Sequence, residues 1–170
     1  MIWLRDIERA CALASALALV AMVVIIVTDV VTRNFLGFSF QISDEFGGYL
    51  LVAATFMAMP VAAARGAFHQ VAFLQMRLPE RARLAVEATV HAISLAVCLI
   101  MEWQIVRFVM INYRSGDAAP TQTGTPLWIP QLAMPIGMGL LCLMLFIRVI
   151  RAIDEWRSYE GADPRDGHGR

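Results

Sequence analysis

The sequence predicts an all-α integral membrane protein with four tilted transmembrane helices, short cytoplasmic interfacial helices and both termini in the cytoplasm. Three observations predict this fold class. Hydrophobic residues make up 59% of the 170-residue chain and charged residues only 16%, whereas about a quarter of the residues of a soluble domain are charged. The apolar residues form four runs long enough to cross a ~30 Å hydrocarbon core. These runs lack the alternation of a membrane β-strand.

Four helices are expected, over residues 10–32, 44–64, 84–112 and 128–150. At a rise of about 1.5 Å per residue, each is long enough to span a bilayer. The third is the longest, so it should tilt or protrude. We expect residues 1–155 to form a single transmembrane domain. The polar tail 156–170, rich in Gly and Pro at its end, is expected to be disordered.

The arginines predict the orientation of these helices. All fourteen basic residues are arginines, and eleven of them lie in the N-terminus, the 65–83 loop and the C-terminal end. Only Arg33, Arg107 and Arg114 fall on the other side. Because basic residues accumulate on the cytoplasmic side, both termini and the 65–83 loop should be cytoplasmic. The 33–43 and 113–127 loops should then face outward.

Two amphipathic segments are expected to lie on the cytoplasmic leaflet as short helices. The first is the N-terminal stretch "MIWLRDIER", in which Trp3 and Ile7 share one face. The second lies in the 65–83 loop, where an apolar stripe recurs at helical spacing. Its members are Phe68, Val71, Leu74 and Leu78.

Small residues and prolines predict how the helices pack. Alanines recur every fourth residue at 54, 58 and 62 and at 10, 14 and 18. Such faces let membrane helices approach closely. Pro60 and Pro135 fall inside predicted spans and should bend them, with the freed carbonyls satisfied by neighbouring groups.

Six charged residues lie close to apolar runs, where charges are costly and often functional. Asp29 and Arg33 are spaced i, i+4, and acidic residues opening the second helix suit its N-terminal dipole. All six fall in the outer halves of their helices, away from the midplane where a transport site is expected. Three interpretations stay open: separate boundary charges, a polar clasp in which an arginine bridges carboxylates between helices, or a coupling-ion or proton site. The six are Asp29, Arg33, Asp44, Glu45, Glu102 and Arg107.

The sequence contains no pattern typical of an enzyme or a cofactor site. Cys11, Cys98 and Cys142 lie singly in apolar runs without metal-ligand spacing, which favours packing roles. His91 has no second histidine at matching depth for a transmembrane haem. The zero net charge gives no reason to expect nucleic-acid binding. We therefore expect no cofactor and no catalytic activity.

Three motifs in order resemble the small membrane subunit, called DctQ-type, of tripartite ATP-independent periplasmic (TRAP) transporters. The first, "DVVTRNFLGFSFQISDEF", matches through Asp29, Arg33 and Glu45, although Gln41-Ile42-Ser43 replaces a segment in which the family has Trp. The second lies in "ARGAFHQVAFLQMRLP", where Gln70 and Ala72 depart from the pattern. It matches through Arg65, Gly66, His69 and Pro79. The third, "TGTPLWIPQLAMPIG", matches through Pro126, Trp128, Pro130, Pro135 and Gly137.

The resemblance implies a non-catalytic scaffold in the bacterial inner membrane, surrounded by lipid. Its partners would be a large membrane subunit, which carries the substrate with a coupling ion, and a periplasmic binding protein that delivers a carboxylate substrate. Outward-facing polar residues are then candidates for docking the binding protein. They are Asn34, Gln41, Arg114, Asp117 and Gln122. Two alternatives stay open: a self-contained four-helix exporter, and a membrane anchor or assembly subunit of another complex.

Overall fold

The computed structural model describes residues 2–37, 42–65, 80–121 and 123–161. Its helices are α1 (Ile2–Leu36), α2 (Ile42–Ala64), α4 (Glu80–Ser115), the short α5 (Trp128–Gln131) and α6 (Ala133–Gly161). Four segments are long and apolar enough to cross a membrane: Arg5–Phe35, Ser43–Ala64, Ala85–Ser115 and Trp128–Asp154. The prediction of an all-α membrane protein with four spanning helices is confirmed.

The ends of three helices differ from the sequence-based boundaries. Residues 2–9 are the first turns of α1 and not a separate interfacial helix. No Gly or Pro interrupts residues 1–36, and the helix ends just before Gly37, whose φ of 72° is typical of a C-terminal cap. Helix α6 continues to Gly161 and so includes the first residues of the predicted tail. The second predicted interfacial segment falls mostly on residues 66–79, outside the described residues.

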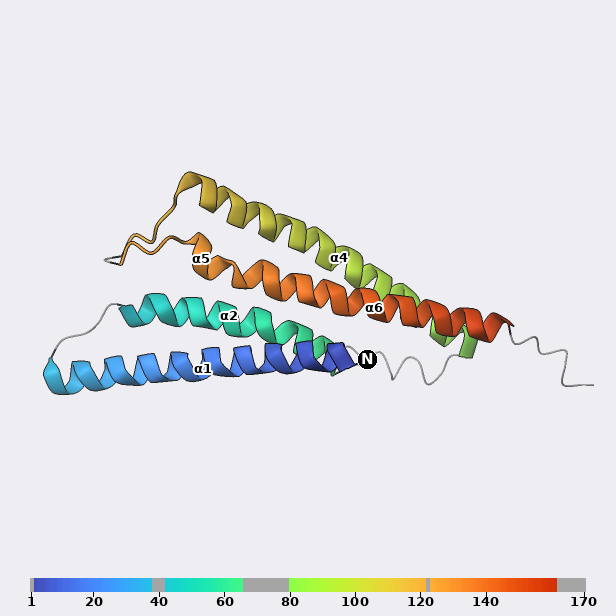
Figure 1. The fold of residues 1–170 in the computed structure, drawn as a ribbon, viewed down its shortest axis with the longest axis horizontal. Helices are drawn as coiled ribbons and strands as arrows, with labels where there is room; N and C mark the ends of the chain where they lie inside the picture. The colour runs from blue at the N-terminus through green and yellow to red at the C-terminus, as the bar shows by residue number, and fades with distance from the viewer. Residues whose placement is uncertain (1, 38–41, 66–79, 122, 162–170) are drawn as a thin grey trace, which may run out of the picture.

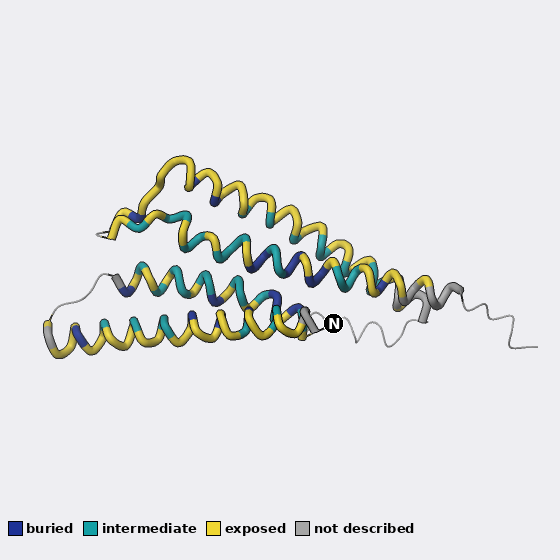
Figure 2. Tube along the Cα trace, viewed as in Figure 1, coloured by how far each residue is buried: buried dark blue, intermediate teal, exposed yellow. Residues whose placement is uncertain are grey.

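The four long helices form an open row in the order α1, α2, α6, α4 (Figure 1). Helix α6 lies inside the row and packs against α2 on one side and α4 on the other. The buried residues gather mainly on α6, whereas α1 and α4 are exposed along most of their length (Figure 2). One buried cluster forms the core; its members are Ala63, Met138, Leu141, Cys142, Met144 and Leu145. The exposed apolar faces of α1 and α4 suit lipid or partner helices better than water.

Small residues join α1 to α2, but only part of each predicted alanine stripe takes part, because Ala18 and Ala54 are buried and the other members are not. Ser15 is buried between Cys11 and Ala18 on α1, and its hydroxyl donates a hydrogen bond of 2.9 Å to the carbonyl of Ala54. The predicted partners at residues 10, 14, 58 and 62 are exposed. Two stripes of small residues run side by side on α1, and the stripe with the hydroxyl donor is the one that packs.

Pro60 and Gly137 explain the close approach of α2 and α6. Pro60 has no N–H, so the carbonyl of Phe56, four residues earlier, lacks its helical hydrogen bond. A Cβ atom added to Gly137 would overlap that carbonyl group and lie 2.8 Å from the Cβ of Phe56. The freed carbonyl therefore faces the backbone of α6, where a Cα–H···O contact suits it.

Pro135 interrupts the fourth span near its beginning. It is the third residue of α6, and the carbonyl that its missing N–H would have bonded belongs to Gln131, the last residue of α5. The span is thus divided at Leu132 between α5 and α6. Pro135 lies in the first turn of α6, where a missing N–H costs little.

Candidate functional site

The carboxylate of Glu45 is the centre of a hydroxyl cluster at the start of α2. Its Oε1 accepts a hydrogen bond from the Tyr49 hydroxyl at 2.9 Å. Its Oε2 accepts one from Thr123 at 2.6 Å and another from Thr121. Thr125 donates in turn to the hydroxyl of Thr123 at 3.1 Å. Both oxygens of one carboxylate on α2 are therefore used to hold the loop between α4 and α5.

That loop, residues 116–127, is closed by its own backbone. The amide of Ala119 donates a hydrogen bond to the carbonyl of Thr125 at 2.9 Å. The amide of Leu127 donates one to the carbonyl of Asp117 at 3.0 Å. Gly116 and Gly124 adopt positive φ angles of 67° and 58°, which glycine tolerates at turns. These hydrogen bonds and turns give a compact loop of defined conformation at one end of the row.

Two further contacts fix the ends of this loop. The side-chain amide of Asn112, near the end of α4, donates a hydrogen bond of 2.8 Å to the side-chain carbonyl of Gln131 on α5. The rings of Tyr113 and Trp128 meet edge to face with centroids 5.3 Å apart. Such aromatic pairs add to the packing of the two elements. The contacts between α4 and α5 therefore fix the two ends of the loop, while Glu45 of α2 binds its threonines.

The remaining charges of the predicted clasp are spread over several surroundings. Asp29 is half-buried, and Arg33 and Asp44 are exposed. The Arg107 guanidinium lies 5.8 Å from the centre of the Trp103 ring on its own helix. The hydrogen bonds that the structure describes for Glu45 come from hydroxyl groups. A clasp in which an arginine bridges carboxylates between helices stays a prediction.

Glu102 lies deeper than the shared outer depth expected of the six charges. The span Ala85–Ser115 is centred on Ile100, so Glu102 is within one helical turn of its centre. Its Oε1 would lie 3.5 Å from a Cβ atom placed on Gly139 of α6. Its Oε2 is buried and has no hydrogen-bond partner in the described part of the chain.

The contact between Gly137 and Phe56 fixes the relative level of Glu102. Phe56 is eleven residues beyond Glu45 on α2, or about 16 Å along the helix. Because Gly139 lies one half-turn further along α6 than Gly137, and α2 and α6 run in the same direction (Figure 1), Glu102 is level with the second half of α2. The outer depth that motivated the clasp therefore does not extend to Glu102.

The described residues offer no metal centre. No group of three His, Cys, Asp or Glu side chains in the ranges 2–37, 42–65, 80–121 and 123–161 is arranged to hold a metal ion. His91 lies 3.8 Å from Glu87, one turn away on α4.

Comparison with known protein families gives a match over residues 22–155 to the DctQ component of the tripartite ATP-independent periplasmic transporters. The chain belongs to the DctQ family. It is therefore a multi-pass membrane protein and the small (Q) subunit of a TRAP transporter. A comparison with curated proteins gave no match. The matched region begins inside α1 and ends inside α6, so it takes in the second half of the first span and all of the other three spans of this DctQ subunit.

The second and third motifs of the DctQ subunit differ in how many of their residues the structure describes. In the 65–79 motif, Arg65 follows α2 and its Nε lies 3.0 Å from Oε1 of Glu8 on α1. Gly66, His69 and Pro79 lie outside the described residues. In the later motif, Pro126 pairs with Ala118 across the loop, and Trp128 and Pro130 form α5. The structure thus assigns the later motif to one region, where the 116–127 loop turns into α6.

Three of the five candidate docking residues lie within the described part of the chain. Arg114 and Asp117 are exposed where α4 ends and the loop begins, and Asn34 is exposed near the end of α1. Gln41 and Gln122 lie outside the described residues. The loop threonines that bind Glu45 could not be singled out from the sequence, because isolated threonines in a polar loop carry no motif.

Arg148 of the DctQ subunit is a second residue that sequence reasoning missed. Its Nη2 donates to the carbonyl of Ala64 at 3.1 Å and also to that of Ala63. These are the last carbonyls of α2, which have no partner within their own helix. An arginine from α6 thus caps α2 and offsets the negative end of its dipole. An arginine inside an apolar run was the available signal.

Proposed function

We propose that this DctQ subunit is a non-catalytic scaffold for the large membrane subunit of its TRAP transporter in the bacterial inner membrane. The observation that carries the proposal is the open row of four helices. In a closed bundle each helix would pack against two long neighbours, but α1 and α4 lie at the edges of the row and expose apolar residues along their length, such as Leu17 at 67% and Ile100 at 62%. A flat layer of this kind suits a partner on its faces, with lipid filling the rest.

The proposed orientation keeps both termini in the cytoplasm. The start of α1 and the end of α6 lie at the same end of the row (Figure 1). That end carries Arg5, Arg9, Arg65, Arg148 and Arg151, as the positive-inside rule requires of a cytoplasmic surface. The 116–127 loop then faces the periplasm.

We also propose that this loop helps to dock the periplasmic substrate-binding protein during ion-coupled uptake of a carboxylate substrate. The loop is held by Glu45 and closed by its own backbone, so little conformational freedom is lost when a partner binds. Arg114 and Asp117 are exposed beside it and offer charges of both signs. A rigid, polar, outward surface is what a soluble partner needs.

The scaffold is tested by co-purification. The DctQ subunit, tagged and co-expressed with a large TRAP membrane subunit from the same transporter, should retain that subunit through detergent extraction and size-exclusion chromatography. An unrelated four-helix membrane protein with the same tag is the control. Elution of the DctQ subunit without the large subunit, in mild detergent and in nanodiscs alike, would contradict the scaffold.

A self-contained exporter is the second candidate, and the position of Glu102 favours it. An exporter needs an ionisable group deep in a helix, and Glu102 lies near the centre of its span with a buried oxygen. Transport by this polypeptide alone in liposomes would support the exporter. The exposed row of helices and the family match support the scaffold instead.

A further inference from the structure

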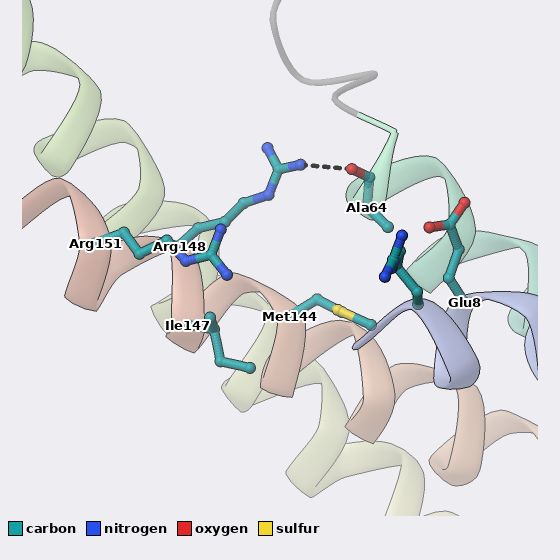
Figure 3. A pocket seen from close by; sticks show the side chains of 7 residues that line it. Glu8, Ala64, Met144, Ile147, Arg148 and Arg151 are labelled. Carbon is teal, nitrogen blue, oxygen red and sulfur yellow. Dashed lines mark hydrogen bonds between the residues drawn. The ribbon is translucent and has the colours of Figure 1, made fainter. Parts of the chain in front are cut away.

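A cavity of about 350 Å³ opens at the end of the row where α1 begins and α2 and α6 end. Arg5 of α1 and Arg148 and Arg151 of α6 line it, and Met144 and Ile147 add apolar surface (Figure 3). The end of α2 closes one side at Ala64. Two helices that are far apart in sequence, α1 and α6, thus contribute three guanidinium groups to one small space, and α6 adds an apolar wall.

The charge of this arginine pocket is positive. Among the described residues that line it, Glu8 is the one acidic residue, and it pairs with Arg65 at 3.0 Å, so the charge of Glu8 is largely offset. Arg148 uses Nη2 to cap α2, which fixes its guanidinium at the pocket wall. A guanidinium has five N–H donors, so Arg148 retains donors for a ligand. Arginine is well suited to phosphate because its planar fork can donate two parallel hydrogen bonds.

The position of the pocket selects between sources of phosphate. The spans Arg5–Phe35 and Ser43–Ala64 end at the pocket, and Arg148 and Arg151 lie in the last turns of Trp128–Asp154. This is the level at which lipid headgroups meet acyl chains. A soluble phosphate would contact the arginines alone, whereas a phospholipid would also contact the apolar wall formed by Ile147 and the edge of Met144. Basic pockets between membrane helices are known to favour anionic headgroups.

We propose that the arginine pocket binds the phosphate of an anionic phospholipid headgroup, with the lipid's glycerol and upper acyl carbons against Met144 and Ile147. The lipid would join Arg5 to Arg151 and so connect α1 to α6. In the described structure the extensive contacts of α1 are with α2, and those of α6 are with α2 and α4. The inference needs neither the scaffold nor the docking role, because it rests on the pocket alone.

The test is the melting temperature of the full-length subunit in lipid nanodiscs. In discs of phosphatidylcholine with a third phosphatidylglycerol, the wild type should melt several degrees higher than in pure phosphatidylcholine, since a ligand that binds only the folded state stabilises it. The double variant Arg5→Gln/Arg151→Gln should lose most of that increase. The matched control Arg9→Gln/Arg157→Gln removes two charges from the same helices outside the pocket and should keep it.

Each of these measurements has a result that would overturn the proposal. An equal phosphatidylglycerol effect in the pocket variant and the wild type would overturn the proposal, as would its loss in the control variant. The same increase from inorganic phosphate in phosphatidylcholine discs would show a soluble-anion site and overturn the lipid assignment. If the double variant does not fold, Arg5→Gln alone is compared with Arg9→Gln by native mass spectrometry of retained phosphatidylglycerol. Equal retention would then overturn the proposal.

Discussion

Gly137 lies against the carbonyl of Phe56, which Pro60 leaves without its helical hydrogen bond. Three residues from two helices thus depend on one another at a single contact. The proline frees the carbonyl, and the glycine lets the backbone of α6 reach it. Any side chain at 137 would have to displace the backbone of α2 and not merely a flexible side chain.

Replacing Gly137 by Ala should therefore destabilise the subunit by about 1–3 kcal/mol, the usual cost of overpacking a well-packed contact. The matched control is Gly47→Ala, because a Cβ atom at Gly47 of α2 meets nothing within 4 Å. Ala is a better helix former than Gly, so the control should be neutral or slightly stabilising. Thermal unfolding of both variants in one detergent measures the difference. Equal melting temperatures for the two would contradict the close approach of α2 and α6.

The sequence pointed to several of these residues without their partners. Gly137 and Glu45 were found as motif positions, because family motifs preserve residue types at fixed spacing. Their partners, Phe56 and the loop threonines, could not be predicted, since a backbone carbonyl carries no sequence signal and threonine is common in loops. The depth of Glu102 could not be predicted, because the level of one helix relative to its neighbours depends on contacts such as the approach of Glu102 to Gly139, which no local pattern indicates.

The 116–127 loop behaves as an element in its own right, although it contains no helix of its own. Glu45 holds it through Thr121 and Thr123, and Asn112 and Trp128 fix its two ends. An ordered loop positions its exposed charges, and a loose loop would spread them. The order of the loop and its proposed docking role can therefore be tested separately.

The double variant Thr121→Val/Thr123→Val should loosen the loop while leaving the helices intact. Amide hydrogen exchange over residues 117–127 should become several-fold faster, because the loop loses both links to Glu45. Exchange within α2 and α6 should stay as in the wild type. Thr55→Val is the control, since the Thr55 hydroxyl bonds only the carbonyl of Leu51 in its own helix, at 2.8 Å. Unchanged exchange in the loop would show that Glu45 does not order it.

Reversing a charge beside the loop tests docking. Arg114→Glu and Asp117→Arg should each slow substrate uptake by the complete transporter several-fold, because surface charges steer and orient an incoming protein. Both variants should retain the large subunit on co-purification. Arg9→Glu, at the other end of the row, is the control and should leave uptake unchanged. Wild-type uptake in both loop variants would count against the docking surface.

The existence and approximate limits of the helices followed from hydropathy, but their pairing did not. In a lipid-facing protein apolar residues surround each helix, so periodicity carries little information about the packed face. The alanines at 10 and 14 were expected to pack, yet Cys11 and Ser15 are buried beside them. Ser15 decides the register through its hydrogen bond to Ala54, a contact between residues that no local pattern connects.

The whole molecule is a layer and not a closed bundle. Helix α6 contacts both α2 and α4, while α1 packs against α2 at one edge of the row. Much of the apolar surface of α1 and α4 is exposed, and the polar contacts lie mainly at the two ends, around Glu45 and around Arg148. This arrangement agrees with a stationary support that offers broad faces to a partner and has shaped surfaces at the membrane boundaries.

Reconstitution tests most directly whether this DctQ subunit supports transport without carrying substrate. Uptake is measured in proteoliposomes holding the subunit alone, the large subunit alone, or both, with the substrate-binding protein and an ion gradient present. We expect uptake only when both membrane subunits are present. Gradient-driven transport by the DctQ subunit alone, or full uptake by the large subunit without it, would contradict the claim.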